Sequence, residues 1–160
     1  MIRLGITGGI GSGKSYVAHL LEEKGFPLYD TDREAKRLTL THPRIREALS
    51  TLLGTEVYQA DGTLNKPLLA SYLFSSPEHA EQINGIIHPC VYEDFQVWAH
   101  RQEEAGAQVV MMESAILFES GFQKAVDYVV MVYAPLELRI KRAMQRDAAS
   151  EAQIRARISA

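Results

Sequence analysis

The most informative residues for chemistry are Gly8-Gly9-Ile10-Gly11-Ser12-Gly13-Lys14-Ser15, which fit the pattern G-x-x-x-x-G-K-S. Its glycines allow the backbone to adopt positive φ and to direct successive N–H groups at phosphate oxygens. Lys14 supplies a positive charge for the terminal phosphates, and the Ser15 hydroxyl is suitably placed to bind Mg²⁺. The stretch therefore predicts a phosphate-binding loop, here called the phosphate loop (residues 8–15).

The residues on either side of the phosphate loop support this interpretation. Ile2, Leu4 and Ile6 form a run typical of a buried strand, and apolar residues recur at helical spacing from Val17 to Leu21. A helix that begins directly after the loop attracts anions to its N-terminus. The alternative, a glycine-rich surface turn, accounts for neither flanking element.

Two acidic residues are expected at the carboxyl ends of strands, where open α/β sheets bind their ligands. Asp32 follows a predicted strand over residues 26–30, and it is either the cap of the next helix or a functional carboxylate facing the cleft. Glu113 ends a strand predicted over residues 108–113. It either holds the water shell of a metal ion or is a solvated strand end.

Further candidate side chains lie later in the chain. His88 is beside Pro89, and Glu119 lies in an apolar loop, where it is a candidate ligand for substrate or for an arginine. Arg142 and Arg146 share one face of a predicted helix with Arg139, the weaker candidate of the three. Phosphoryl transfer requires cations over the transferred group, so these arginines are candidates for that role, although a charged face is usually only solvated.

These residues must be positioned by elements that the sequence also predicts. The first helix is expected over residues 14–24. The strand 26–30 either lies at a sheet edge or starts at Pro27, because proline cannot donate a ladder hydrogen bond. Residues 33–106 are predicted to be helical with polar turns, with Pro89 kinking or breaking a long helix. Two strands, over residues 108–113 and 128–133, have the continuous apolar character of buried parallel strands, and a helix begins at Pro135.

Length and composition limit the possible functions. The chain has 160 residues and a formal net charge of −3, which gives no general attraction to nucleic acid. Its single cysteine, Cys90, excludes an internal disulfide and suits a reducing compartment. No run approaches the ~18 apolar residues of a membrane span, and no signal peptide is evident. We therefore expect a single cytoplasmic domain without a membrane or nucleic-acid partner.

Several separate motifs together resemble the dephospho-coenzyme A kinase family. They are the phosphate loop, the Asp30-Thr31-Asp32 segment, Asp61-Gly62, Asn84 with His88-Pro89, Ile116-Leu117-Phe118-Glu119 and the arginine helix. The phosphate loop is shared with many kinases, so Asp32, His88-Pro89 and Leu117-Phe118-Glu119 discriminate best.

The resemblance implies an α/β fold of the P-loop NTPase class, similar to nucleoside-monophosphate kinases, with a parallel sheet flanked by helices. It implies a nucleotide-binding core (1–31 and 107–134), a helical substrate-binding insertion (32–106), and a lid with the start of a returning helix (135–160). The implied reaction is ATP-dependent phosphorylation of the ribose 3′-hydroxyl of dephospho-CoA, with Mg²⁺, in a monomer or weak homo-oligomer.

The resemblance also assigns roles to individual residues. Asp32 is the probable base at the acceptor hydroxyl, and it acts with Lys14, Arg142 and Arg146 in catalysis. His88 and Glu119 bind substrate together with Asp32, and Ser15 is the Mg²⁺ ligand. The residues expected to bind ATP are Gly8, Gly9, Gly11, Ser12, Gly13, Lys14, Ser15 and Tyr16.

Three features depart from the family pattern. Tyr16 stands where threonine is usual, and Ser114-Ala115 replaces a proline-containing stretch. The chain also stops at Ala160, within the expected returning helix, whereas the family adds a fifth strand, an adenine-contacting loop and a final helix. We therefore expect a core that lacks its C-terminal part.

Other functions compete with this one. The nearest alternative is another small-molecule or nucleotide kinase of the same fold, which would differ mainly in its helical insertion. A GTP-binding switch is disfavoured because the sequence has no Asn-Lys-x-Asp motif. A remodelling ATPase would carry an adjacent Asp-Glu pair where this chain has Glu113-Ser114. A non-catalytic nucleotide-binding module is disfavoured while Lys14, Ser15 and Asp32 are all present.

Overall fold

The structure, a computed structural model, describes residues 1–159. These residues form two compact units. The first contains Met1–Asp30 and the segment from Trp98 onward, and the second is Thr31–Val97. Each unit is described separately below.

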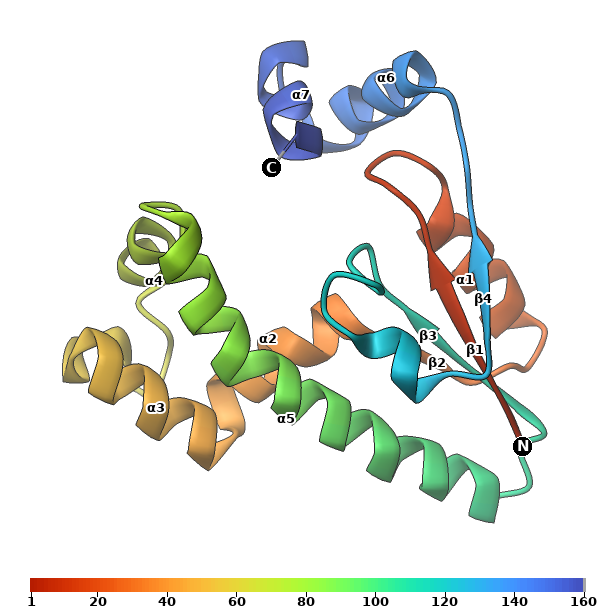
Figure 1. Cartoon of the computed structure of the whole chain (residues 1–160), viewed down its shortest axis with the longest axis horizontal. Helices are drawn as coiled ribbons and strands as arrows, with labels where there is room; N and C mark the ends of the chain where they lie inside the picture. The colour runs from red at the N-terminus through yellow and green to blue at the C-terminus, as the bar shows by residue number, and fades with distance from the viewer. Residues whose placement is uncertain (160) are drawn as a thin grey trace. The chain divides into compact units, whose positions relative to one another are not determined.

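The first unit is built on a four-stranded parallel sheet (Figure 1). Its strands are β1 (Ile2–Thr7), β2 (Leu28–Asp30), β3 (Val109–Glu113) and β4 (Tyr128–Met131), in the order β2-β3-β1-β4. The edge position predicted for the strand after Pro27 is confirmed, although β2 begins at Leu28. Because all strands are parallel, their carboxyl ends meet at one edge of the sheet.

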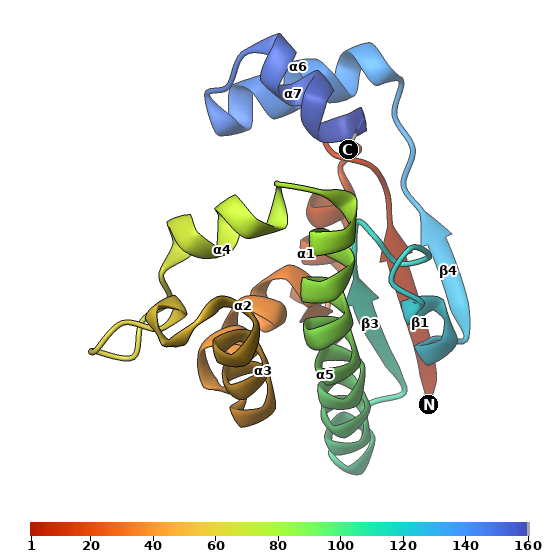
Figure 2. The same ribbon diagram turned by 60° about the vertical axis from the view of Figure 1, so that its left-hand side comes forward.

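Helix α1 (Lys14–Glu23) packs on this sheet (Figure 2). Ile6, Ala18, Leu28 and Met111 form the shared apolar core, each at most 5% exposed. The strand predicted to be buried over residues 108–113 is confirmed as β3, whose last four residues are buried. These contacts fix the end of β1 and the start of α1, which the phosphate loop connects.

The prediction that residues 128–133 form a buried strand is wrong about burial. β4 is a strand, but Tyr128 and Met131 are each 64% exposed, and the residues between them are exposed as well. The reason is its position in the sheet. β4 pairs with β1 alone, and within residues 1–159 no other strand pairs with its outer edge. The apolar sequence of β4 therefore predicts a strand correctly, but it does not predict whether that strand is buried.

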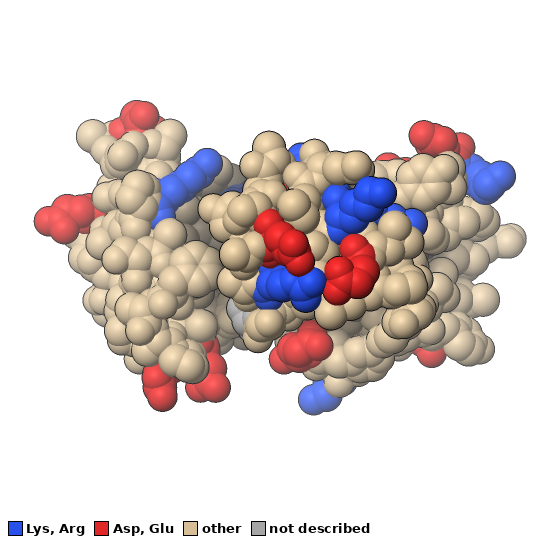
Figure 3. All heavy atoms as spheres, turned by 90° about the horizontal axis from the view of Figure 1, so that it is seen from above, with Lys and Arg blue, Asp and Glu red and all other residues tan. Residues whose placement is uncertain are grey.

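A pair of helices follows β4, consisting of α6 (Leu136–Asp147) and α7 (Glu151–Ser159). They pack through a small apolar cluster of Ile140, Ala143 and Ile154, which partly buried Ile10 of the phosphate loop joins. The outer surface carries charges of both signs (Figure 3). Arg155 illustrates this mixture, since it contacts Glu137 on α6 and Glu151 on α7. The α6–α7 pair lies in the segment predicted to form a lid, and α7 extends through the last described residue.

The second unit is helical. It contains α2 (Thr31–Thr41), α3 (Pro43–Leu53), the 3₁₀ turn η1 (Thr55–Val57), α4 (Lys66–Leu73) and the N-terminal part of α5 (Pro77–Glu104). Arg37 pairs with Asp94 at 2.6 Å and Arg44 with Glu93 at 2.7 Å, so α2 and α3 are both tied to α5. The predicted turn at Asp61-Gly62 is confirmed, with Gly62 at φ 87°.

Helix α5 is not broken at Pro89, contrary to one form of the prediction. Proline in a helix interior removes one backbone hydrogen bond and costs about 3 kcal/mol. Here buried apolar residues lie on both sides of the proline, with Ile83 before it and Val91 and Phe95 after it, each at most 2% exposed. Burial of these side chains offsets the lost hydrogen bond and keeps the helix continuous.

Within residues 1–159, no helix combines the length and apolar character needed to cross a lipid bilayer.

Candidate active site around the phosphate loop

The phosphate loop curves tightly between β1 and α1. Gly11 and Gly13 have φ values of 76° and 97°, in the left-handed region that favours glycine, and the Ser12 N–H donates to the carbonyl of Gly9 at 3.0 Å. Gly13 is also the N-cap of α1, so the free N–H groups of that helix face the concave side of the loop. This backbone geometry suits a bound anion.

A buried carboxylate contacts the side chains of both Lys14 and Ser15. Glu113, 5% exposed at the end of β3, accepts a hydrogen bond from Ser15 Oγ at 2.6 Å through Oε1. The same oxygen lies 3.4 Å from Lys14 Nζ. The alternative that Glu113 is a solvated strand end is therefore wrong.

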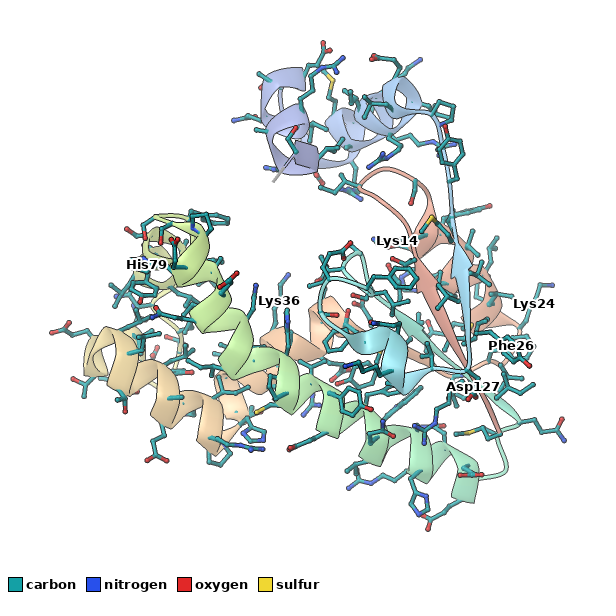
Figure 4. The ribbon with its side chains drawn as sticks, in the orientation of Figure 1. Lys14, Lys24, Phe26, Lys36, His79 and Asp127 are labelled. Carbon is teal, nitrogen blue, oxygen red and sulfur yellow. The ribbon has the colours of Figure 1, made fainter. Side chains whose placement is uncertain are left out.

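A cavity of about 280 Å³ opens on the concave side of the loop. The residues that line it are Gly9, Gly11, Ser12, Gly13, Lys14, Ser15, Tyr16, Arg142 and Arg146. Lys14 projects from the loop end of β1, at the opposite end of the sheet from Asp127 (Figure 4). The cavity thus gathers three cationic side chains and a helix N-terminus, an arrangement with strong affinity for phosphate groups.

The three arginines of α6 make different contacts. Arg139 donates from Nε to the carbonyl of Ile10 at 2.9 Å. Arg142 Nη1 lies 3.4 Å from the carbonyl oxygens of Gly11 and Ser12, so its hydrogen bonds are long and easily exchanged.

Arg146 makes a two-point contact with Asp147, at 2.9 and 3.1 Å. The hydrogen bond from Arg146 lowers the pKa of Asp147, and the pKa of Arg146 is raised in turn. Asp147 also pairs with Arg157 of α7.

A second cavity, of about 260 Å³, lies beside the loop and shares Gly9 and Ser12 with the first. Glu119, Phe118, Tyr133 and Arg139 are among its lining residues. Ser12 lies between the two cavities, and its buried Oγ has no hydrogen-bond partner within residues 1–159. A buried hydroxyl of this kind is normally satisfied, so its position at both cavities suits a bound polar ligand.

Asp32 and His88 belong to the helical unit. Helix α2 begins at Thr31, two residues earlier than expected, so Asp32 lies exposed within the first turn of the helix and Asp30 precedes it. The possibility that Asp32 is the cap of this helix is therefore wrong. His88 is half-buried on α5, and burial lowers its pKa from the usual value of 6.5.

Comparison with known proteins identifies the family. The family model for dephospho-CoA kinase matches residues 2–160. A dephospho-CoA kinase of Bacteroides fragilis is 57% identical over 98% of this chain, and one of Porphyromonas gingivalis is 46% identical over 99%. The chain belongs to the dephospho-CoA kinase family. It covers 75% and 76% of these two relatives' own length.

Solved structures agree with the fold. A crystal structure from Thermus thermophilus matches 98% of this chain, and 78% of its own, with a TM-score of 0.79 and 35% identity. A shikimate kinase of Acinetobacter baumannii matches 99% of this chain and 75% of its own, with a TM-score of 0.51 and 18% identity, which supports the fold alone. The predicted α/β P-loop kinase fold is confirmed.

The first cavity brings together Arg142, Arg146 and all of the predicted ATP-binding residues except Gly8, which lines the second cavity. Glu119 lies in the second cavity. The sequence pattern leaves Glu113 open between a metal-binding role and a solvated strand end, and it favours Arg142 and Arg146 over Arg139. The sequence signals for these two residues are the position of Glu113 at a strand end and the helical spacing of the arginines. Neither signal specifies which groups the side chain contacts.

Proposed function

We propose that this protein transfers the γ-phosphoryl group of ATP to the ribose 3′-hydroxyl of 3′-dephospho-CoA, the final step of coenzyme A biosynthesis. The observation that carries the proposal is the first cavity, where Lys14, Arg142 and Arg146 converge on the N-terminus of α1. Membership of the dephospho-CoA kinase family specifies the acceptor, which the phosphate loop alone does not.

The triphosphate occupies the first cavity, and its oxygens accept hydrogen bonds from the backbone N–H groups of the loop, from Gly9 to Ser15. Tyr16 is exposed on α1 and lines the same cavity, which supports a contact with the nucleotide. When the nucleotide binds, the Lys14 ammonium group leaves its ion pair with Glu113 and contacts the terminal phosphates instead.

The donor set near Ser15 fits Mg²⁺. Among residues 1–159 no cluster of three His, Cys, Asp or Glu side chains is present, but Mg²⁺ bound with a nucleotide needs only one or two protein oxygens besides phosphates and waters. Ser15 Oγ and Glu113 Oε1, 2.6 Å apart, are such a pair. When bound, Mg²⁺ neutralises phosphate charge.

Asp32 orients the acceptor hydroxyl and accepts its proton late in the reaction. The transition state of phosphoryl transfer is loose, so orientation and charge neutralisation matter more than the strength of the base. Arg142 and Arg146 stabilise charge on the transferred group. His88 and Glu119 bind dephospho-CoA. A cytoplasmic location and a monomeric or weakly self-associating state complete the proposal.

The test is mass-spectrometric detection of product after incubation with ATP and Mg²⁺. The acceptors are dephospho-CoA, shikimate, gluconate and nucleoside monophosphates, each offered separately. We expect the mass of one phosphate to be added to dephospho-CoA alone. Transfer to a different acceptor would replace this proposal by the alternative, another small-molecule or nucleotide kinase of the same fold.

A further inference from the structure

The first turn of α6 lies directly against the phosphate loop. A Cβ built on Gly9 would be 2.0 Å from Arg139 Nη2, and one built on Gly11 would be 2.1 Å from the carbonyl oxygen of Arg139. At Gly11 the obstacle is the backbone of α6, so no side chain fits there while α6 occupies this place, and at Gly9 a side chain would displace the Arg139 guanidinium group. The G-x-x-x-x-G-K-S pattern requires glycine at positions 8 and 13 but not at 9 and 11, so the additional glycines have a second purpose here.

Ile10 contacts α6 in two ways. Its carbonyl accepts the 2.9 Å hydrogen bond from Arg139 Nε, and its side chain packs against the apolar cluster of Ile140, Ala143 and Ile154. Ile10 occupies a variable position of the motif, and nothing in phosphate binding requires an apolar side chain there. An isoleucine at this position instead contributes apolar contact with α6 and α7, against which it is partly buried.

We propose that Ile10 and Arg139 dock the α6–α7 pair on the phosphate loop, and that Gly9 and Gly11 leave the space for this contact. Arg139 is then a positioning residue. It holds α6 in place so that Arg142 and Arg146, which follow at one-turn spacing on the same helix, line the phosphate cavity. The inference rests on the proposed phosphoryl transfer for its consequence, whereas the docking contacts join residues of this chain alone.

Arg139 and Arg142 therefore have different roles. Arg139 has the shorter bond to the loop and also lines the second cavity, whereas Arg142 has two long contacts that a phosphate can replace. During phosphoryl transfer, Arg142 leaves the carbonyl oxygens for the transferred group, and Arg139 stays with Ile10. The helix remains docked while one of its arginines changes partner.

Hydrogen–deuterium exchange of the nucleotide-free protein tests the docking. Arg139→Met and Ile10→Ala each remove one contact, and Lys141→Met is the control, because Lys141 is an exposed cation on the same helix. We expect both docking variants to speed exchange of the α6 amides about 10-fold or more, the factor for one lost charge-assisted hydrogen bond or buried apolar contact. β3 provides the internal reference for an intact fold. Exchange in α6 as slow in both variants as in Lys141→Met would overturn the proposal.

Kinetics then separate positioning from direct contact with the nucleotide. If Arg139 positions the helix, Arg139→Met lowers kcat about 10-fold while the affinity for ATP, measured by calorimetry, changes less than 3-fold. An equal loss of ATP affinity would instead make Arg139 a phosphate ligand and overturn the positioning role. The exchange measurement needs no acceptor, so failure to form coenzyme A would refute the proposed function and leave the docking result standing.

Discussion

Replacing Glu113 by glutamine removes one negative charge from beneath the phosphate loop and leaves the shape of the side chain almost unchanged. Lys14 Nζ then loses its partner at 3.4 Å, and Ser15 keeps only a neutral acceptor in place of a carboxylate at 2.6 Å. Both groups of the ion pair are largely shielded from water, since the side chain of Lys14 is 15% exposed and that of Glu113 is 6% exposed. The substitution therefore acts on a buried pair and not on a surface one.

The size of the effect follows from these distances. Two unit charges 3.4 Å apart attract by about 5 kcal/mol at an effective dielectric constant of about 20. Removing the carboxylate charge also removes its desolvation cost, which offsets much of this attraction. We expect Glu113→Gln to lower the free energy of unfolding by about 2 kcal/mol, or the Tm by about 4–8 °C for a chain of this size.

Thermal unfolding followed by circular dichroism measures this effect in nucleotide-free protein. Glu23→Gln, an exposed substitution on α1, is the matched control and should leave the Tm within about 1 °C. Adding ADP with EDTA supplies phosphates to Lys14 in the absence of metal. The Tm difference between Glu113→Gln and the unsubstituted protein should then narrow.

A Tm loss for Glu113→Gln no larger than that of Glu23→Gln would refute the reasoning. A double-mutant cycle gives an independent check. Lys14→Met combined with Glu113→Gln should destabilise less than the sum of the two single substitutions, because the second substitution removes a charge that has already lost its partner. Additive losses would show that the two side chains do not interact.

Four further predictions concern activity and pH. Lys14→Ala should reduce the rate of coenzyme A formation about 100-fold or more, because it removes a cation from the terminal phosphates; near-normal turnover would contradict this. Asp32→Asn should lower kcat about 100-fold or more while ATP affinity, measured by calorimetry, stays within a few-fold, as expected for a group that acts only on the acceptor. Arg142→Ala should slow phosphoryl transfer in single-turnover assays about 100-fold; an unchanged rate would show that this arginine is merely solvated. His88→Gln should reduce the loss of Tm between pH 7.5 and pH 5.5.

The sign of the His88 effect follows from its burial. Burial lowers the pKa of His88 in the folded state below 6.5, so the unfolded chain takes up a proton first as the pH falls. Stability is therefore lost as the pH falls from about 7 through 6.5 toward the folded-state pKa of His88. Identical pH dependence in His88→Gln and the unsubstituted protein would show that this histidine does not contribute.

Local features of the site could be predicted from the sequence because contiguous residues determine them. The phosphate loop depends on glycines that permit positive φ and on a strand and helix encoded directly beside it, and all of these are present in the structure. Pro27 predicts that the strand beside it lies at a sheet edge or starts at the proline, and β2 is an edge strand that begins at Leu28. The spacing of the arginines on α6 likewise follows from helical periodicity.

Other features could not be predicted because they depend on what surrounds a residue. The apolar residues of β4 have the same pattern as those of β3, yet β4 is exposed and β3 is buried, since burial depends on neighbours in the sheet. Pro89 predicts a kink or a break in α5, and the break is wrong because apolar packing on both sides keeps the helix continuous. Helix propensity is weak compared with such tertiary contacts.

The chemistry available at the phosphate loop is therefore encoded within a few consecutive residues. Which distant groups join the loop depends on tertiary contacts. Glu113 reaches Ser15 across 98 positions of the chain, and Arg139 reaches Ile10 across 129. Contacts at such separations arise from the parallel sheet, which brings the carboxyl ends of β1 and β3 together, and from the docking of α6, and no local pattern specifies either.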